Sequence, residues 1–133
     1  MTNREEIEAI VANDTYMNLL GMRAVDVGSD TAVMEMPAKA VLENPYGVVH
    51  GGALYSLADC VCGMAARGDG RSYVTLSSSF NYLRPGPMGD TIRATATVRR
   101  RGGSTCYVEV EVTDSQGNLL CGGNSVFYCI EKK

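Results

Sequence analysis

Two hydrophobic periodicities divide the chain. Apolar residues recur at helical spacing from Gly52 to about Arg67, and they surround nearly the whole helix, which predicts a buried helix. A shorter helix is predicted near the N-terminus, capped by Thr2 or Asn3 and followed by Gly21. The rest of the chain is dominated by shorter segments in which apolar and polar residues alternate, as in strands.

Six strands are predicted from this alternation. Residues 22–36 read as two strands joined at Gly28-Ser29-Asp30, and four more follow at 74–82, 91–98, 106–112 and 119–130. Short connectors between alternating strands indicate antiparallel hairpins. One long helix with about six strands is an α+β architecture, in which we expect the sheet to fold around the helix. We find no repeat or linker, so residues 1–133 are expected to form one domain.

Composition excludes several classes of protein. A net charge of -3 argues against general nucleic-acid binding. The five cysteines form no C-x-x-C pair and the chain has one histidine, so no zinc site is expected and the thiols should be reduced core residues. We see no signal-peptide pattern and no apolar run of about 18 residues, so we expect a cytoplasmic protein without a membrane partner.

The most informative segment is 44–52, which reads Asn-Pro-Tyr-Gly-Val-Val-His-Gly-Gly and leads into the long helix. Helix N-termini present free backbone N–H groups and a partial positive charge. Glycines allow a ligand to approach that backbone closely. Asp59 lies within the apolar helix that follows and has no obvious structural reason to be there. Together they indicate a site that polarises a carbonyl group.

Several motifs spaced along the chain carry a family resemblance. They are Asn44…Gly47…His50-Gly51-Gly52, Ser56-Leu57-Ala58-Asp59, Phe80-Asn81-Tyr82-Leu83-Arg84-Pro85 and Gly89-Asp90. In combination they resemble the hotdog-fold acyl-CoA thioesterases of the PaaI type, over about residues 20–126. The resemblance implies a sheet wrapped around a central helix, two-fold pairing, and usually a dimer of dimers. It implies hydrolysis of an aryl- or fatty-acyl-coenzyme A, with no metal or cofactor.

The resemblance also implies roles for residues of the helix and its entrance. Asp59 matches the family's general base or nucleophile, and the Gly51 N–H would donate to the carbonyl oxygen as charge develops. His50 would orient the turn, and Gly52 would lie against the substrate. Glycines here are also explained by the turn alone, and the two interpretations are compatible.

Two further positions match the family with less specificity. Asn44 would contribute an amide that places the nucleophile or the carbonyl, although Asn-Pro is also a common turn initiator. Thr75 would hydrogen-bond the attacking water, although threonine is common in strands and Ser77 competes for the role.

Spacing sets a limit that is independent of the family. Gly51 and Asp59 are eight residues apart, or ~12 Å along a helix. A nucleophile and an oxyanion donor must each lie within ~3 Å of the reacting atoms. If both residues are catalytic, the site must combine Gly51 of one subunit with Asp59 of another, so we expect a homo-oligomer.

Basic residues provide candidates for the coenzyme A end. Three adjacent arginines, Arg99, Arg100 and Arg101, could bind phosphates, although a solvated strand end explains them equally well. The next residues, Gly102, Gly103 and Ser104, could let the pantetheine arm pass, and Arg84 is a second cation that could face the nucleotide.

Three other functions are considered. A hotdog hydratase or dehydratase would place its acid differently relative to its histidine. A non-catalytic acyl-CoA sensor or carrier is the main alternative, but no helix-turn-helix segment accompanies the domain and Asp59 is present. A Cys60 or Cys62 nucleophile paired with His50 ranks last, because they lie about three turns apart on one helix.

Overall fold

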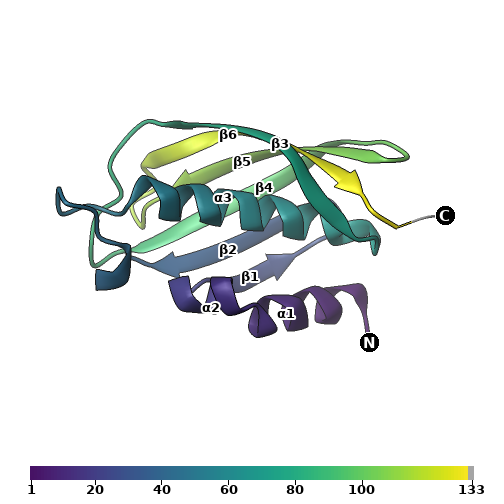
Figure 1. Cartoon of the computed structure of the whole chain (residues 1–133), viewed down its shortest axis with the longest axis horizontal. Coiled ribbons are helices and arrows are strands. Elements are labelled where there is room, and N and C mark those ends of the chain that lie inside the picture. The colour runs from purple at the N-terminus through teal and green to yellow at the C-terminus, as the bar shows by residue number, and fades with distance from the viewer. Residues whose placement is uncertain (132–133) are drawn as a thin grey trace.

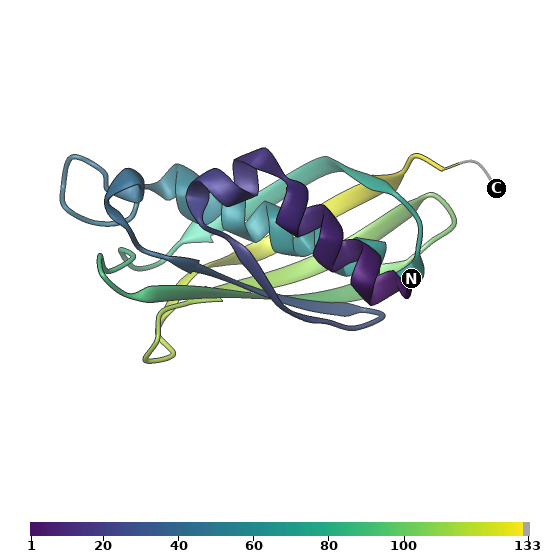
Figure 2. The ribbon, with the colours of Figure 1, turned by 90° about the horizontal axis from the view of Figure 1, so that it is seen from below.

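The computed structural model describes residues 1–131 and shows a six-stranded antiparallel sheet wrapped around one long helix (Figures 1 and 2). This confirms the predicted α+β architecture. The elements in chain order are α1 (Asn3–Asn13), α2 (Thr15–Leu20), β1 (Arg23–Val27), β2 (Thr31–Pro37), η1 (Ala40–Leu42), α3 (Gly51–Ala66), η2 (Arg67–Asp69), β3 (Tyr73–Tyr82), β4 (Thr91–Arg101), β5 (Thr105–Thr113) and β6 (Leu119–Cys129).

The strands lie in the order β1-β2-β4-β5-β6-β3, so β1 and β3 are the two edges of the sheet. The two edges differ in length: β1 has 5 residues and β3 has 10. Strand β3 pairs only with β6. Its other side therefore presents a long row of backbone groups without a strand partner within residues 1–131.

Helix α3 packs on the inner face of the sheet, where Leu57 and Val61 are fully buried. The inner face of β4 carries Ala94 and Ala96, also fully buried, whose small side chains let the helix approach the sheet closely. The prediction that α3 is buried on all sides is wrong for this chain. One stripe of the helix is exposed or only partly buried, and it contains Gly52, Tyr55, Ser56, Asp59, Cys60 and Gly63.

The N-terminal helix is capped as predicted. Thr2 and Glu5 form a capping box, in which each side chain accepts a hydrogen bond from the other's backbone N–H. The sequence prediction missed α2, whose six residues are too few to show a helical period. Asp14 caps this helix, and Gly21 ends it in the left-handed conformation, with a φ of 79°. No helix within residues 1–131 is long and apolar enough to cross a membrane.

A polar network closes the C-terminal end of α3. Arg101 donates to the carbonyl of Ala66 at 2.7 Å and pairs with Asp69 at 3.1 Å. Asp69 also accepts from the Tyr73 hydroxyl at 2.6 Å and from Arg71 Nε at 2.9 Å. Burial alone would raise the pKa of Asp69, but the hydrogen bonds from Tyr73 and Arg71 and the charge of Arg101 lower it to about 2.

We therefore expect Asp69 to stabilise the fold at neutral pH and to lose this effect in acid. Its folded pKa lies below its usual value of 3.8, so the stabilisation is complete above pH ~5 and disappears as the pH falls toward 2. Asp69→Asn should lower the midpoint of thermal unfolding by roughly 2–4 °C at pH 7. The difference from the unsubstituted chain should shrink at pH 3, and a difference independent of pH would contradict this account.

Candidate active site

The N-terminus of α3 presents one backbone donor that the chain itself leaves free. His50 is the N-cap residue, and its Nδ1 accepts a hydrogen bond from the Gly52 N–H at 3.2 Å. The His50 carbonyl accepts from the N–H groups of Ala53 and Leu54, at 2.9 and 3.2 Å. None of the residues 1–131 accepts a hydrogen bond from the Gly51 N–H. This donor is therefore available for an oxyanion at the positive end of the helix.

The peptide that follows Gly51 is held at both ends. The Tyr82 hydroxyl donates to the Gly51 carbonyl at 2.9 Å, while His50 accepts from the N–H of the same peptide unit. Tyr82 is the last residue of β3, so the edge strand helps to fix the orientation of the helix start. His50 and Tyr82 are thus positioned to orient the free donor of Gly51.

Asn44 shapes the loop that enters the helix. Its Oδ1 accepts from the N–H groups of Tyr46 and Val48, at 2.9 and 3.2 Å. These bonds form the turn expected from the Asn-Pro dipeptide. The side-chain carbonyl of Asn44 is therefore occupied by the turn. Its side-chain NH2 group is the part available to a substrate.

These groups border a groove of about 360 Å³, here called the Gly51 groove. Arg84 is exposed at its rim. Its lining residues are Asn44, Val48, Val49, Gly51, Leu54, Tyr82, Leu83, Arg84, Pro85 and Gly86. The groove therefore combines a free N–H, an amide and a cation.

Asp59 and Thr75 form a second polar contact, away from the Gly51 groove. The Thr75 hydroxyl donates to Asp59 Oδ1 at 2.8 Å, joining β3 to α3. They lie in a second groove of about 320 Å³, here called the Asp59 groove, whose walls are mainly apolar. It is lined by Ile7, Ile10, Val11, Met17, Asp59, Cys60, Gly63, Met64, Arg67, Tyr73, Val74, Thr75 and Phe127. Ser77, the competitor of Thr75, does not line this groove, and its carbonyl accepts from the buried Ser125 hydroxyl at 3.0 Å.

No described residue lines both grooves. The predicted acid and the predicted oxyanion donor are therefore parts of two separate depressions in one chain. Of the predicted site residues, Asn44, Gly51 and Arg84 line the Gly51 groove, whereas Asp59 and Thr75 line the Asp59 groove.

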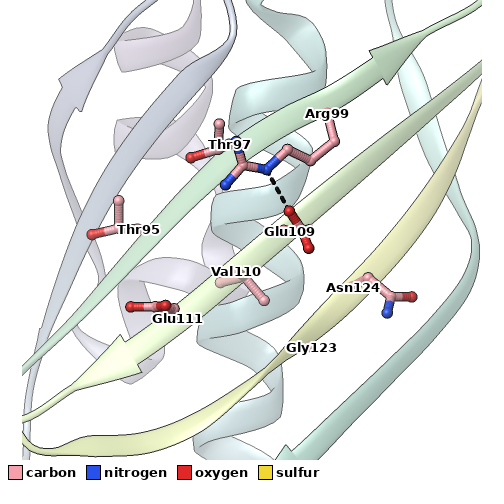
Figure 3. Close-up of a pocket in the computed structure, with 8 residues that line it drawn as sticks. All are labelled: Thr95, Thr97, Arg99, Glu109, Val110, Glu111, Gly123 and Asn124. Carbon is pink, nitrogen blue, oxygen red and sulfur yellow. Dashed lines mark hydrogen bonds and ion pairs between the residues drawn. The ribbon is translucent and has the colours of Figure 1, made fainter.

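A bulge in β4 separates the arginines that are adjacent in sequence. Val98 pairs with Val108 and Arg100 with Tyr107, which leaves Arg99 as an extra residue. Arg99 forms an ion pair with Glu109 above a groove of about 490 Å³, on the sheet face away from α3 (Figure 3). Arg101 instead points to the end of α3, where its guanidinium is occupied by Ala66, Asp69 and Asp30. We therefore do not retain Arg101 as a phosphate ligand.

The residues Gly102, Gly103 and Ser104 form the turn between β4 and β5. Arg71 donates to the carbonyls of Gly103 and Gly102, at 2.8 and 3.4 Å, and so holds the turn beside the C-terminal end of α3. Gly51 lies at the opposite end of that helix. Within one chain the turn therefore does not meet the Gly51 groove, and a role in binding stays a prediction.

The cysteines do not have the properties of nucleophiles. Burial, followed by the charges of Asp59 and Asp14, raises the pKa of the Cys60 thiol to about 12, and burial also raises that of Cys62. Such thiols stay protonated at neutral pH. No group of three metal-ligating side chains occurs within residues 1–131.

Sequence reasoning missed two tyrosines that hydrogen-bond to the first half of α3. Tyr82 was part of a recognised motif but was given no role. Tyr16, on the unpredicted α2, shares a 2.5 Å hydrogen bond with the Ser56 hydroxyl, which also donates to the Gly52 carbonyl at 2.8 Å. The sequence contains no local signal for either contact, because the partners are 31 and 40 residues apart.

Comparison with known proteins identifies the family of the chain. Residues 46–121 match the family model of the thioesterase superfamily. The acyl-coenzyme A thioesterase PaaI of Escherichia coli (strain K12) is 33% identical over 112 residues, which cover 84% of this chain and 80% of that protein. The structure of E. coli PaaI, from the phenylacetic acid degradation operon, matches with a TM-score of 0.89 and 30% identity, covering 97% and 94% of the two chains. A hypothetical thioesterase of Streptococcus pneumoniae TIGR4, solved with coenzyme A, matches with a TM-score of 0.80 and 26% identity, covering 84% and 88%.

The protonated state of Cys60 leads to a simple expectation. Iodoacetamide at pH 7.5 should modify Cys60 in the folded protein at least about 10-fold more slowly than in the urea-unfolded chain, because the thiolate is the reactive form. Peptide mass spectrometry against time measures both rates. Equal rates in the two states would revive the cysteine as a candidate nucleophile.

Proposed function

Because this chain belongs to the thioesterase superfamily, as an acyl-CoA thioesterase of the PaaI type with a hotdog fold, we propose that it hydrolyses aryl- or fatty-acyl-coenzyme A in a site shared between two copies. The observation that carries this proposal is the separation of Gly51 and Asp59 into two grooves of one chain. The likeness to PaaI favours an arylacetyl group, and the likeness to a structure solved with coenzyme A supports binding of that carrier.

Helix geometry supports the shared site. Gly51 and Asp59 both belong to α3, and eight residues of helix separate them by ~12 Å. Two copies of α3 running antiparallel across a two-fold axis would bring Gly51 of one copy to Asp59 of the other. The same operation produces a second, equivalent site.

The edge strand β3 is suited to such a pairing. It is a long edge, and Leu76 is 62% exposed on it, while Val74 is also exposed. Exposed apolar residues on a long edge are usually covered in soluble proteins. The partly exposed stripe of α3 beside it contains the small residues Gly52 and Ser56, which would allow a second helix to approach closely.

Tyr55 relates the helix pairing to the strand pairing. It lies midway between Gly51 and Asp59, and its hydroxyl bonds to the Ser78 hydroxyl in β3. An axis that exchanges Gly51 and Asp59 would pass near Tyr55 and therefore near Ser78. We infer that β3 pairs with its own copy about Ser78, which would extend the sheet across the axis.

In the proposed reaction, Asp59 takes a proton from water while the water oxygen bonds to the thioester carbon. The carbonyl electron pair moves onto the oxygen, where the Gly51 N–H of the other copy stabilises it. The electron pair on this oxygen then re-forms the C=O bond and the C–S bond breaks. Asp59 gives its proton to the leaving sulfur, so that coenzyme A leaves as the thiol. Direct attack by Asp59, through an anhydride, would use the same two groups.

The surrounding residues orient these two groups. Thr75 fixes one oxygen of Asp59 by its 2.8 Å hydrogen bond and so leaves the other oxygen to act. His50 and Tyr82 hold the peptide next to the Gly51 donor, and Asn44 lines the same groove, where its side-chain NH2 group is proposed to contact the thioester carbonyl. Arg84 is proposed to bind a phosphate of coenzyme A as an exposed cation at the rim.

Two inactive variants should restore activity when mixed. Asp59→Ala should lower kcat at least about 100-fold, while the folded protein still binds coenzyme A. Gly51→Pro removes the N–H donor and should lower kcat by roughly 10²–10³-fold. Proline fits here because Gly51 is the first helical residue, His50 before it is extended, and a Cβ would lie 3.5 Å from Tyr82.

Mixed dimers of these variants carry one intact site out of two. A 1:1 mixture, unfolded and refolded together, should therefore recover about a quarter of the unsubstituted activity in a thiol-release assay. Gly51→Ala, which keeps the N–H, is the matched control and should retain most of the turnover. A mixture as inactive as its components would place the complete site within one chain.

Arg84→Ala should raise KM for acyl-CoA by roughly 5–20-fold with little change in kcat, because the lost contact is made equally by substrate and transition state. The effect should weaken at high ionic strength. Arg93→Ala is the matched control, since Arg93 is also exposed but pairs with Glu35 on β2. Equal KM changes in the two variants would rule out a specific role for Arg84.

A further inference from the structure

Gly63 occupies a helix position where the fold does not need a glycine. It lies in the interior of α3, and its φ is not positive. A Cβ built on it would meet only the Phe127 ring, at 3.6 and 3.9 Å, which is ordinary van der Waals contact. Glycine inside a helix is about 1 kcal/mol less favourable than alanine. The missing side chain therefore destabilises the helix without relieving a clash.

The missing side chain does enlarge the Asp59 groove. Gly63 is four residues after Asp59, one helical turn further on the same face, and both residues line that groove. Apolar side chains surround Gly63, with Met64 beside it on α3 and Phe127 on β6. Any side chain at position 63 would fill the space that begins at Asp59.

The opposite wall comes from the N-terminal helix. Ile7 and Val11 of α1 are buried, whereas Ile10 is 42% exposed at the mouth of the groove. Arg67 borders the groove two turns beyond Asp59, or ~12 Å along α3. The groove is thus apolar next to the acid and meets a cation only near its far end.

We propose that Gly63 determines the depth of the acyl pocket, so that the enzyme prefers apolar acyl groups that reach Gly63 or extend beyond it. This inference rests on the proposed function, because it takes Asp59 as the group that acts on the thioester. Gly63 lies ~6 Å from Asp59 along the helix. At ~1.5 Å a bond, an acyl chain of roughly five carbons reaches it. An octanoyl group would pass this position, the far edge of a phenylacetyl ring would reach it, and an acetyl group would end before it.

The experiment compares kcat/KM for acetyl-, octanoyl- and phenylacetyl-CoA, measured by thiol release. In the unsubstituted enzyme both longer substrates should be preferred over acetyl-CoA. Gly63→Val should lower the octanoyl-to-acetyl and phenylacetyl-to-acetyl ratios at least about 10-fold, the usual effect of filling an apolar pocket. Gly63→Ala should lower them less, and Ile10→Ala should not lower them, because it widens the mouth.

Ala12→Val is the matched control. It adds the same kind of bulk to an exposed helix position outside the Asp59 groove, and should leave both ratios within about twofold. Thermal unfolding establishes that each variant is folded, and if Gly63→Val does not fold, Gly63→Ala decides the test.

The outcomes separate the two proposals. Hydrolysis of none of the three substrates by the unsubstituted enzyme would overturn the proposed function. Hydrolysis with unchanged ratios in the Gly63 variants, or an equal loss on all three substrates, would overturn the role of Gly63 alone.

Discussion

The fixed rise of an α-helix constrains everything proposed for this protein. Helix α3 carries both the free Gly51 N–H and the Asp59 carboxylate, and its hydrogen bonds hold them ~12 Å apart. Neither group can approach the other without breaking the helix. Packing of α3 against Ala94 and Ala96 of β4 prevents such a distortion, because the helix has no room to shift toward the sheet. The helix therefore holds these two groups at a fixed separation.

The two ends of α3 are built differently. At its start, polar contacts from His50 and Tyr82 hold a single peptide and leave one donor unused. At its end, Arg101 donates to the carbonyls of Ala65 and Ala66 and so caps the helix. The N-terminal end of α3 is therefore open to a ligand, whereas its C-terminal end is capped by the Arg101 side chain.

Local periodicity was sufficient to predict much of this fold. Helix α3, the six strands and the turn at Asn44 follow from hydrophobic spacing and from residues with strong turn preferences. The spacing of Gly51 and Asp59 along one helix also follows from the sequence alone.

Features that depend on contacts distant in sequence were not predictable in this way. The bulge that turns Arg99 and Arg101 to opposite faces of β4 depends on pairing with β5, and three consecutive arginines look alike in sequence. The partly exposed stripe of α3 was missed because its residues apart from Asp59 are apolar or small, and composition does not distinguish a buried helix face from an exposed one of this kind. Tyr82 becomes meaningful only once the end of β3 lies beside the start of α3.

The exposed edge strand has a consequence for solubility. A ten-residue edge with Val74 and Leu76 exposed is a template on which further strands could add without limit. A two-fold contact through β3 would close that edge, because each copy would satisfy the other and leave no free row for a third. Protection against aggregation and completion of the active site would then be the same event. Substitutions on β3 that prevent this contact would then lower the solubility of the protein as well as its turnover, even where they touch no substrate.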